Sequence, residues 1–248
     1  MMPKYIALDF DGVICNSMDE CMLVSFCSYF DLSISRNRFS EISSDQKENF
    51  KNYRYLVGPA HEYFDLWNAI ETSKSEDQIT SIFHNNKKNS KSLKRAQEIF
   101  YKNRENLKSS NYSYWVKLNP FYNKISKILF DIGDINKVYI VTSKDYISVA
   151  NLLGSNKLPI QKKNIYSYEK SLDKKVLFKQ LLDDNKIKIN DISFFDDKLS
   201  HLENVSSLGI KSYLALWGYV SPNCKIEARN KGILPITEIG FKQALNDI

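Results

Sequence analysis

A short apolar run that ends in two aspartates constrains the fold more than any other feature of the chain. Residues 5–8, Tyr-Ile-Ala-Leu, lead into Asp9 and Asp11, and Gly12 follows. Because the run does not alternate with polar residues, it predicts a strand buried on both faces of a parallel sheet. Functional side chains in such sheets lie beyond the carboxyl ends of the strands, where Asp9 falls, and a glycine allows a sharp turn there.

The spacing of the two aspartates predicts a cation site. Two carboxylates at one strand end repel each other and lose solvation, and a cation between them offsets both costs. Hard oxygen ligands favour Mg²⁺. The alternative is that Asp9 and Asp11 are solvated and inert in a turn. The features downstream favour the site.

The composition is that of an ordinary globular protein with room for an inserted subdomain. The chain has 248 residues, of which 43% are hydrophobic, and its formal net charge is +6. The modest basic excess can attract phosphorylated substrates. No stretch has the uninterrupted basic density of an arm that binds nucleic acid, so no nucleic-acid partner is expected.

The cysteines and the apolar residues predict a cytoplasmic protein. Cysteines stand at positions 15, 21, 27 and 224 and form no Cys-x-x-Cys pair, which favours free thiols in a reducing compartment. The first four residues carry one charge and lead into the predicted strand, so no secretory segment is expected. No apolar run approaches the roughly 20 residues of a membrane span, so no membrane attachment is expected.

Two kinds of pattern divide the chain. From residue 18 to residue 114 apolar residues recur at helical spacing, and Gly58-Pro59 marks a break. Beyond residue 115 strands and helices alternate. The predicted strands are 137–141, 164–168, 192–195 and 210–216, and the predicted helices are 123–132, 145–153, 173–183 and 199–208. The alternation predicts an α/β fold with a Rossmann-like, doubly wound parallel sheet and an inserted helical subdomain.

Two of the later strands also end in polar residues. Thr142 and Ser143 follow the second strand, where hydroxyl groups and the free amides of a helix start suit phosphate oxygens. Asp196 and Asp197 follow the strand at 192–195. Helix capping is the alternative role for all four residues.

Taken in order, these strand ends resemble the motifs of the haloacid dehalogenase-like (HAD) hydrolases. Asp-Phe-Asp-Gly resembles motif I, whose first Asp is a nucleophile that becomes an aspartyl-phosphate. Its second Asp is the general acid and then the general base, so the resemblance implies these roles for Asp9 and Asp11. Thr142 and Ser143 resemble the phosphate-binding motif II. Dehalogenases of this family usually lack the second Asp, so its presence favours phosphoryl transfer.

The resemblance also implies a lysine that neutralises charge between the nucleophile and the phosphate. In the family this lysine lies at the start of the helix before the motif IV strand. Lys174 and Lys175 both lie there, and the sequence after Lys175 fits the family pattern better. Lys144, directly after motif II, is a third candidate.

Motif IV of the family supplies further Mg²⁺ ligands in one of two forms. The Asp pair form matches Asp196 and Asp197, and we expect Asp196 to be the ligand and Asp197 to be a ligand or to lie just behind it. The Gly-Asp-x-x-x-Asp form would begin at Asp197 and place His201 where the second Asp belongs. The implied metal set is therefore Asp9, Asp11, Asp196 and Asp197.

Family members of this kind insert a helical C1-type cap between the first and second core strands. The resemblance implies a catalytic core of residues 1–17 and 115–248 and a cap of residues 18–114. It assigns substrate selectivity to the cap, where Arg54 is a candidate for binding an anionic substrate and a surface arginine is the alternative. Trp217-Gly218-Tyr219 resembles a segment of phosphoglycolate phosphatase-like members that helps to close the core.

The resemblance implies a Mg²⁺-dependent phosphatase that acts on a small phosphorylated metabolite. A phosphomutase with the same core, acting on a sugar phosphate, is the first alternative, and a non-catalytic binding protein is the second. Other chemistries lack support: the three histidines show no His-Glu-x-x-His spacing, and neither a Gly-x-Ser-x-Gly elbow nor a P-loop is present. Phosphoglycolate, sugar phosphates and nucleotides all remain open as substrates.

Overall fold

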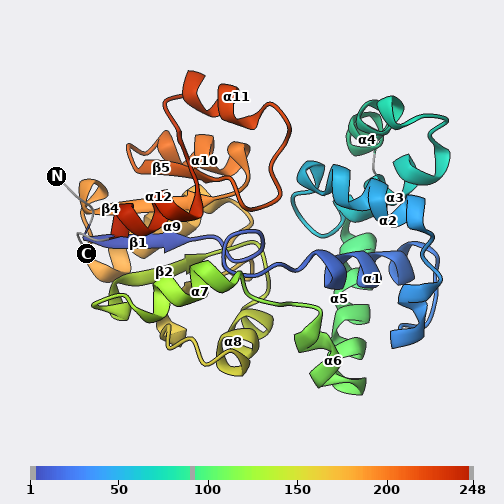
Figure 1. Ribbon diagram of the computed structural model, residues 1–248, viewed down its shortest axis with the longest axis horizontal. Coiled ribbons are helices and arrows are strands. Elements are labelled where there is room, and N and C mark those ends of the chain that lie inside the picture. The colour runs from blue at the N-terminus through green and yellow to red at the C-terminus, as the bar shows by residue number, and fades with distance from the viewer. Residues whose placement is uncertain (1–3, 90–92, 246–248) are drawn as a thin grey trace. The chain divides into compact units, whose positions relative to one another are not determined.

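A computed structural model of the chain describes residues 4–89 and 93–245. Residues 1–3, 90–92 and 246–248 lie outside it. The prediction that the first four residues form no secretory segment therefore falls mostly outside the described residues. The chain divides into two compact units (Figure 1): Met1–Asn16 with Pro120–Ile248, and Ser17–Asn119. The boundaries expected from the sequence lie at residues 17 and 114.

The first unit, which we call the core unit, is built on a six-stranded parallel sheet. The strands are β1 (Tyr5–Leu8), β2 (Val138–Val141), β3 (Ile165–Tyr166), β4 (Ile192–Asp196), β5 (Lys211–Ala215) and β6 (Leu234–Ile236). Their order across the sheet is β3-β2-β1-β4-β5-β6. The chain adds β2 and β3 on one side of β1 and then β4, β5 and β6 on its other side, so the sheet is doubly wound. The α/β fold predicted from the sequence is confirmed.

Helices connect the strands, as the predicted alternation requires. They are α7 (Asn123–Phe130), α8 (Tyr146–Ser155), α9 (Lys174–Asn185), α10 (Leu199–Ser206), α11 (Cys224–Asn230) and α12 (Glu238–Leu245). Three short 3-10 helices, Ile135–Lys137, Lys162–Asn164 and Ile189–Asp191, precede β2, β3 and β4. Parallel strands need such crossovers because a tight turn cannot join them.

Two predictions about the helix and strand ends were wrong. The helix predicted at 145–153 was expected to end before Gly154, but α8 continues to Ser155 and Asn156 is its cap residue. The chain turns at Lys157, the residue after this cap, which has a left-handed φ of 55°. The strand predicted at 210–216, which is β5, was the last one expected, but β6 pairs with it at the sheet edge. Pro235 in β6 weakened the strand pattern, and proline is tolerated at such an edge.

The core unit is held together by apolar residues on both faces of the sheet. Phe194 of β4 is fully buried and packs edge-on against Phe178 of α9, with ring centroids 4.9 Å apart. On the same strand Phe195 stacks on Tyr213 of β5 with centroids 4.6 Å apart. Successive residues of a strand point to opposite faces, so β4 is buried on both. This explains why its sequence does not alternate.

The second unit, which we call the cap unit, is helical. It contains α1 (Met18–Tyr29), α2 (Ser44–Tyr53), α3 (Glu62–Thr72), α4 (Glu76–Asn89), α5 (Leu93–Ser110) and α6 (Tyr112–Lys117), with 3-10 helices at Arg36–Ser40 and Arg54–Leu56. Among its described residues there is no β-strand. Gly58-Pro59 lies between the second 3-10 helix and α3, as the predicted break requires.

An aromatic cluster forms the centre of the cap unit. Tyr63 of α3 stacks between Phe50 and Phe100, with ring centroids 5.8 and 5.2 Å away. The Nε1 of Trp67, one helical turn from Tyr63, donates a hydrogen bond to the Ser25 hydroxyl of α1 at 2.8 Å. The residues that gave the helical spacing in the sequence are therefore the ones that pack together.

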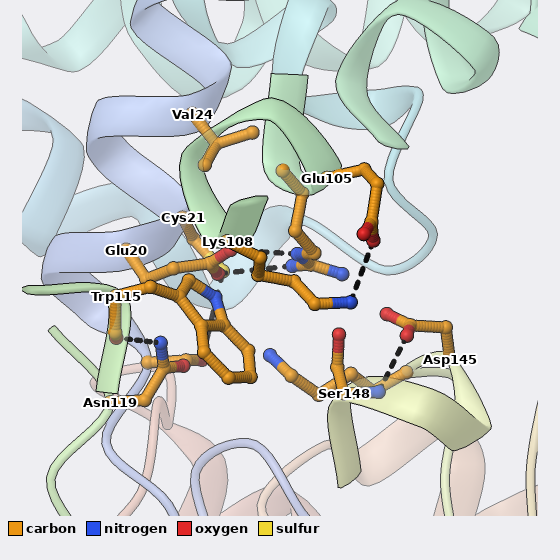
Figure 2. Close-up of polar contacts among 12 residues, drawn as sticks. Glu20, Cys21, Val24, Glu105, Lys108, Trp115, Asn119, Asp145 and Ser148 are labelled. Atoms are coloured by element: carbon orange, nitrogen blue, oxygen red, sulfur yellow. Dashed lines mark hydrogen bonds and ion pairs between the residues drawn. The ribbon is translucent and has the colours of Figure 1, made fainter. Parts of the chain in front are cut away.

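Paired charges are buried within the cap unit. Glu20 of α1 accepts hydrogen bonds from Arg104 of α5 at 2.7 and 3.0 Å. One turn further along α5, the buried Lys108 donates to Glu105, whose side chain is exposed, and the Asn119 side chain donates to the Trp115 carbonyl (Figure 2). A buried charge requires a partner of this kind because an unpaired charge costs several kcal/mol.

No helix within the described part of the chain is long and apolar enough to cross a membrane. The four cysteines form no disulfide and all are buried.

Candidate active site

Asp9 lies at the carboxyl end of β1, in the middle of the sheet. Leu8 is in register with Phe195 of β4 and with Ile140 of β2, so the next residue of each strand reaches the same edge. The Asp9 amide donates to the Phe195 carbonyl at 2.9 Å. Its carboxylate is buried and accepts a hydrogen bond from the Phe10 amide at 2.8 Å. The parallel register therefore brings the ends of β1, β2 and β4 together, as the sequence predicts.

Lys174, the first residue of α9, joins the acidic ends of β1 and β4. Its ammonium lies 3.0 Å from Oδ1 of Asp9 and 2.6 Å from Oδ2 of Asp196, and all three residues are buried. Lys175 is the next residue and points elsewhere, where its ammonium donates to the Ser207 hydroxyl at 2.9 Å. The structure thus places Lys174 beside the two carboxylates and the preferred Lys175 away from them, because neighbouring helical residues face about 100° apart and only the first faces the strand ends.

The charges of this group depend on one another. Burial raises the pKa of Asp9 to about 7, against the lowering effect of Lys174. Burial alone would raise the pKa of Asp196 too, but Lys174 and His201 hold it well below its ordinary value. Burial would lower the pKa of Lys174, which Asp196 and Asp9 raise above its ordinary value instead. Lys174 and the two carboxylates therefore shift one another's pKa values, with that of Asp9 raised and that of Asp196 lowered.

Asp11 has a different cationic partner. Lys144 donates to both oxygens of its carboxylate, at 3.1 and 3.2 Å. The Lys144 side chain is fully buried, whereas that of Asp11 is 18% exposed. The third lysine candidate thus lies at the site, and it contacts the second aspartate while Lys174 contacts the first.

The turn after Asp9 packs tightly against Asp197. Gly12 has a φ of +84°, and a Cβ there would lie 2.0 Å from Oδ2 of Asp197. A Cβ on Gly218 would lie 2.4 Å from the Cβ of Asp197. Both positions therefore require glycine. The same Asp197 oxygen accepts from the Tyr219 amide at 2.6 Å, so this carboxylate fastens two loops together.

The Trp-Gly-Tyr segment also holds the turn directly. Trp217 Nε1 donates to the Val13 carbonyl at 3.0 Å, and the Tyr219 hydroxyl donates to the Asn16 side chain at 3.1 Å. These contacts agree with the expectation that the segment helps to close the core.

Thr142 and Ser143 follow β2 at the same edge of the sheet. Thr142 is buried, its amide donates to the Tyr166 carbonyl at 2.9 Å, and its hydroxyl accepts from the Lys144 amide at 3.1 Å. Ser143 is half-buried. Asp145 caps α8 through the Ser148 amide at 2.7 Å (Figure 2). The segment between β2 and α8 is thus fixed by hydrogen bonds, and from it the Lys144 ammonium reaches Asp11.

The donor set fits a divalent cation. Asp9, Asp196 and His201 each offer one ligand atom, and these atoms lie within 4.8 Å of one another; within the described residues they are the one such group of three. The carboxylates of Asp11 and Asp197 are not part of it. Sequence reasoning missed His201 as a component of the site, although its place in the second motif IV form was a signal for it.

Arg54 belongs to the cap unit. It is buried rather than exposed, which contradicts the alternative interpretation of a surface arginine. The Nη1 group of Arg54 donates to the Val57 carbonyl at 3.1 Å, and the guanidinium carbon lies 5.1 Å from the centre of the Tyr63 ring. Its assignment to substrate binding stays a prediction.

Several solved structures share this architecture over their whole length. A predicted phosphoglycolate phosphatase from Lactobacillus delbrueckii subsp. bulgaricus superposes with a TM-score of 0.69 at 10% identity, with 99% of each chain covered. A predicted phosphatase from Clostridium acetobutylicum gives 0.63 at 16% identity, with 100% of each chain covered. A haloacid dehalogenase-like hydrolase from Streptococcus pneumoniae gives 0.58 at 16% identity, covering 95% of this chain and 93% of its own.

The chain has a HAD-like fold. The similarity inferred from the sequence motifs is thus confirmed for the fold, and it extends to the helical unit that the motifs do not cover. No protein-family model and no curated protein matches the sequence. At these identities the comparisons speak for the HAD-like fold alone, so the chemistry has to be argued from the site.

Proposed function

We propose that this HAD-like protein is a phosphatase that hydrolyses a small phosphomonoester through an aspartyl-phosphate. The observation that supports this most is the group formed by Asp9, Lys174 and Asp196. The Asp9 carboxylate is buried at a strand end, and the Lys174 ammonium contacts both this carboxylate and that of Asp196. Asp9 is therefore a candidate nucleophile with a positive charge beside it. That charge is what a phosphoryl group needs as it approaches an anion.

Asp9 attacks phosphorus in this proposal, and the ester oxygen leaves. Asp11 donates the proton that the leaving oxygen takes up, and it then removes a proton from the water that attacks the aspartyl-phosphate. The Asp9–phosphorus bond breaks in this second step and inorganic phosphate is released. The two aspartates therefore have distinct tasks, in agreement with their distinct lysine partners.

Lys144 has to release Asp11 before the first step. Both carboxylate oxygens of Asp11 accept hydrogen bonds from the Lys144 ammonium, so the carboxyl group is already engaged before a substrate binds. A bound phosphate group offers Lys144 a second anion, next to Thr142 and Ser143. Transfer of Lys144 from Asp11 to phosphate would then release the Asp11 carboxyl group for its contact with the leaving oxygen.

Asp9, the main-chain carbonyl of Asp11, and Asp196 would hold a divalent cation. When bound, such a cation supplies positive charge that neutralises the phosphoryl oxygens and orients them. Asp197 is assigned to positioning, because its carboxylate is engaged by the Tyr219 amide and packed on Gly12. Mg²⁺ is the cation implied by the oxygen donors.

The substrate class is a small phosphorylated metabolite. Structurally similar proteins include predicted phosphoglycolate phosphatases from two lactobacilli, which makes phosphoglycolate one member of the panel to be tested. Sugar phosphates and nucleotides belong in the same panel.

A panel of phosphorylated metabolites, assayed for phosphate release with Mg²⁺ and with EDTA, tests the proposal. We expect Mg²⁺-dependent release from at least one member and none from Asp9→Asn at the same protein concentration. Release that persists in Asp9→Asn would contradict the assignment of the nucleophile. Isomerisation of a sugar phosphate without release would indicate a phosphomutase.

A further inference from the structure

His201 lies where the chain turns from β4 into α10, close to the two buried carboxylates. Its Nδ1 is 3.1 Å from Oδ2 of Asp196, and its side chain is 23% exposed while that of Asp196 is fully buried. The His201 amide donates to the Lys198 carbonyl at 3.1 Å, and the Lys198 amide donates to Oδ1 of Asp196 at 2.8 Å. The first turn of α10 therefore fixes the imidazole against Asp196.

The distances match those between ligands of a six-coordinate metal. Two adjacent ligands of an octahedral site with bonds of about 2.1 Å are about 3.0 Å apart. The 3.1 Å between His201 and Asp196 corresponds to one such edge, and one Asp9 ligand atom lies within 4.8 Å of both. Both hydrogen-bonded contacts of Asp9, from Phe10 and from Lys174, use Oδ1. A metal could therefore bind through the other oxygen of Asp9, and at Asp196 it would share Oδ2 with the Lys174 ammonium, which lies 2.6 Å from that oxygen.

We propose that His201 is a nitrogen ligand of this site and that it makes the site prefer Mn²⁺, Co²⁺ or Zn²⁺ to Mg²⁺. The inference rests on the proposed function, because it concerns the cation of the same site. Imidazole binds these transition metals well, whereas Mg²⁺ takes oxygen ligands almost exclusively. A nitrogen donor placed among carboxylates thus changes which ion binds best.

The competing explanation is structural. His201 could serve only as a hydrogen-bond donor that orients Asp196, with no bond to the metal. The two explanations differ in one observable, which is whether a histidine nitrogen is bonded to the bound metal ion.

Pulsed electron paramagnetic resonance of the full-length protein with one equivalent of Mn²⁺ separates them. We expect nitrogen coupling of directly bonded strength, and we expect its pattern to change when the protein is made with ¹⁵N-histidine. His201→Ala should lose the coupling, and the matched control His84→Ala, on an exposed cap-unit position, should keep it. Asp196→Asn should weaken Mn²⁺ binding, which ties the signal to this site.

Competition titrations give a second readout that does not depend on catalysis. His201→Ala should lose roughly ten- to a hundredfold in Mn²⁺ affinity, with a smaller change for Mg²⁺. His201→Asp, which replaces the nitrogen donor by oxygen, should move the preference towards Mg²⁺. Tight Mn²⁺ binding by wild type without any histidine-nitrogen coupling would overturn the proposal, and so would coupling that survives in His201→Ala.

The outcomes distinguish this inference from the proposed function. Histidine-nitrogen coupling in a protein that releases no phosphate from any substrate would support His201 as a metal ligand and contradict the proposal that the protein is a phosphatase. Mg²⁺-dependent phosphate release with no histidine coupling would do the opposite.

Discussion

The ammonium of Lys174 lies 3.0 Å from Oδ1 of Asp9, and both side chains are buried at the end of β1. The same ammonium is 2.6 Å from Asp196, so one cation compensates two carboxylates. Without it, two buried negative charges would face each other, which proteins avoid because the desolvation cost is several kcal/mol per ion. The geometry thus gives Lys174 a role that its neighbour Lys175 cannot have.

Lys174→Met should therefore reduce activity strongly, and Lys175→Met provides the matched control. We expect kcat/KM to fall on the order of a hundred- to a thousandfold for Lys174→Met, as for the loss of one preorganised donor. The Lys175 ammonium donates to the Ser207 hydroxyl and not to the two carboxylates, so its replacement should change kcat/KM less than about twofold. Steady-state kinetics with circular dichroism of each variant makes the comparison, and equal losses in both would contradict the assignment.

The fold was predictable because the strongest sequence signals were the ones that packing requires. The apolar residues 5–8 and 192–195 form β1 and β4, which are buried on both faces and so show no alternation. The edge strand β6 was missed, since it has three residues and contains Pro235. Short edge strands need few apolar residues, so the sequence gives little sign of them.

The site was predictable in part. Parallel register brings strand ends together whatever the side chains are, so Asp9 and Asp196 could be placed beside each other. The choice between Lys174 and Lys175 could not be made, because it depends on the rotation of α9 about its axis. The positions of Asp197 and His201 could not be predicted either. Only the fold shows that the Asp197 side chain packs against Gly12 and that the His201 ring contacts Asp196.

Asp196→Asn and Asp197→Asn should separate metal binding from loop positioning. Asp196→Asn should raise the cation concentration needed for half-maximal activity by roughly tenfold or more, because a charged ligand is lost. Asp197→Asn should instead lower thermal stability by about 1 kcal/mol, as it weakens the hydrogen bond from the Tyr219 amide. Cation titrations and thermal unfolding measure the two effects. An equal rise in the cation requirement for both variants would assign both carboxylates to the metal.

The stability of the protein should depend on pH through Asp65 of the cap unit. Its Oδ2 atom is buried without a hydrogen-bond partner, and burial, with Glu62 nearby, raises the pKa of Asp65 to about 6 against the effect of Lys87. A raised pKa in the folded state means that the stabilising contribution is fully present below pH 4 and is lost as the pH rises through 6.

Asp65→Asn removes this titration. Relative to wild type the variant should gain stability as the pH rises from 4 to 7, by on the order of 1 kcal/mol because solvent partly screens the charge. Urea denaturation of both proteins at the two pH values measures the difference. A difference that is the same at pH 4 and pH 7 would show that Asp65 does not titrate in this range.

Arg54→Lys tests whether the buried arginine has a role beyond packing. The guanidinium donates to the Val57 carbonyl and lies over Tyr63, so Arg54→Ala should destabilise the cap unit by about 1–3 kcal/mol. Arg54→Lys retains the charge, and if Arg54 binds substrate it should raise KM for an anionic metabolite several-fold and leave p-nitrophenyl phosphate hydrolysis nearly unchanged. Arg38→Ala, which removes an exposed ion pair with Glu41, is the control and should alter neither. Equal loss on both substrates would assign Arg54 to folding alone.

Covalent trapping on Asp11→Asn tests the central claim most directly. With p-nitrophenyl phosphate the leaving group needs little protonation, so Asp9 can still attack, whereas hydrolysis of the aspartyl-phosphate loses its base and should slow by roughly a hundred- to ten-thousandfold. Mass spectrometry after a rapid acid quench should then find one phosphoryl group on Asp9 in Asp11→Asn and none in Asp9→Asn. A phosphoryl group on another residue, or no trapped species in an Asp11→Asn protein that turns over like wild type, would contradict the account.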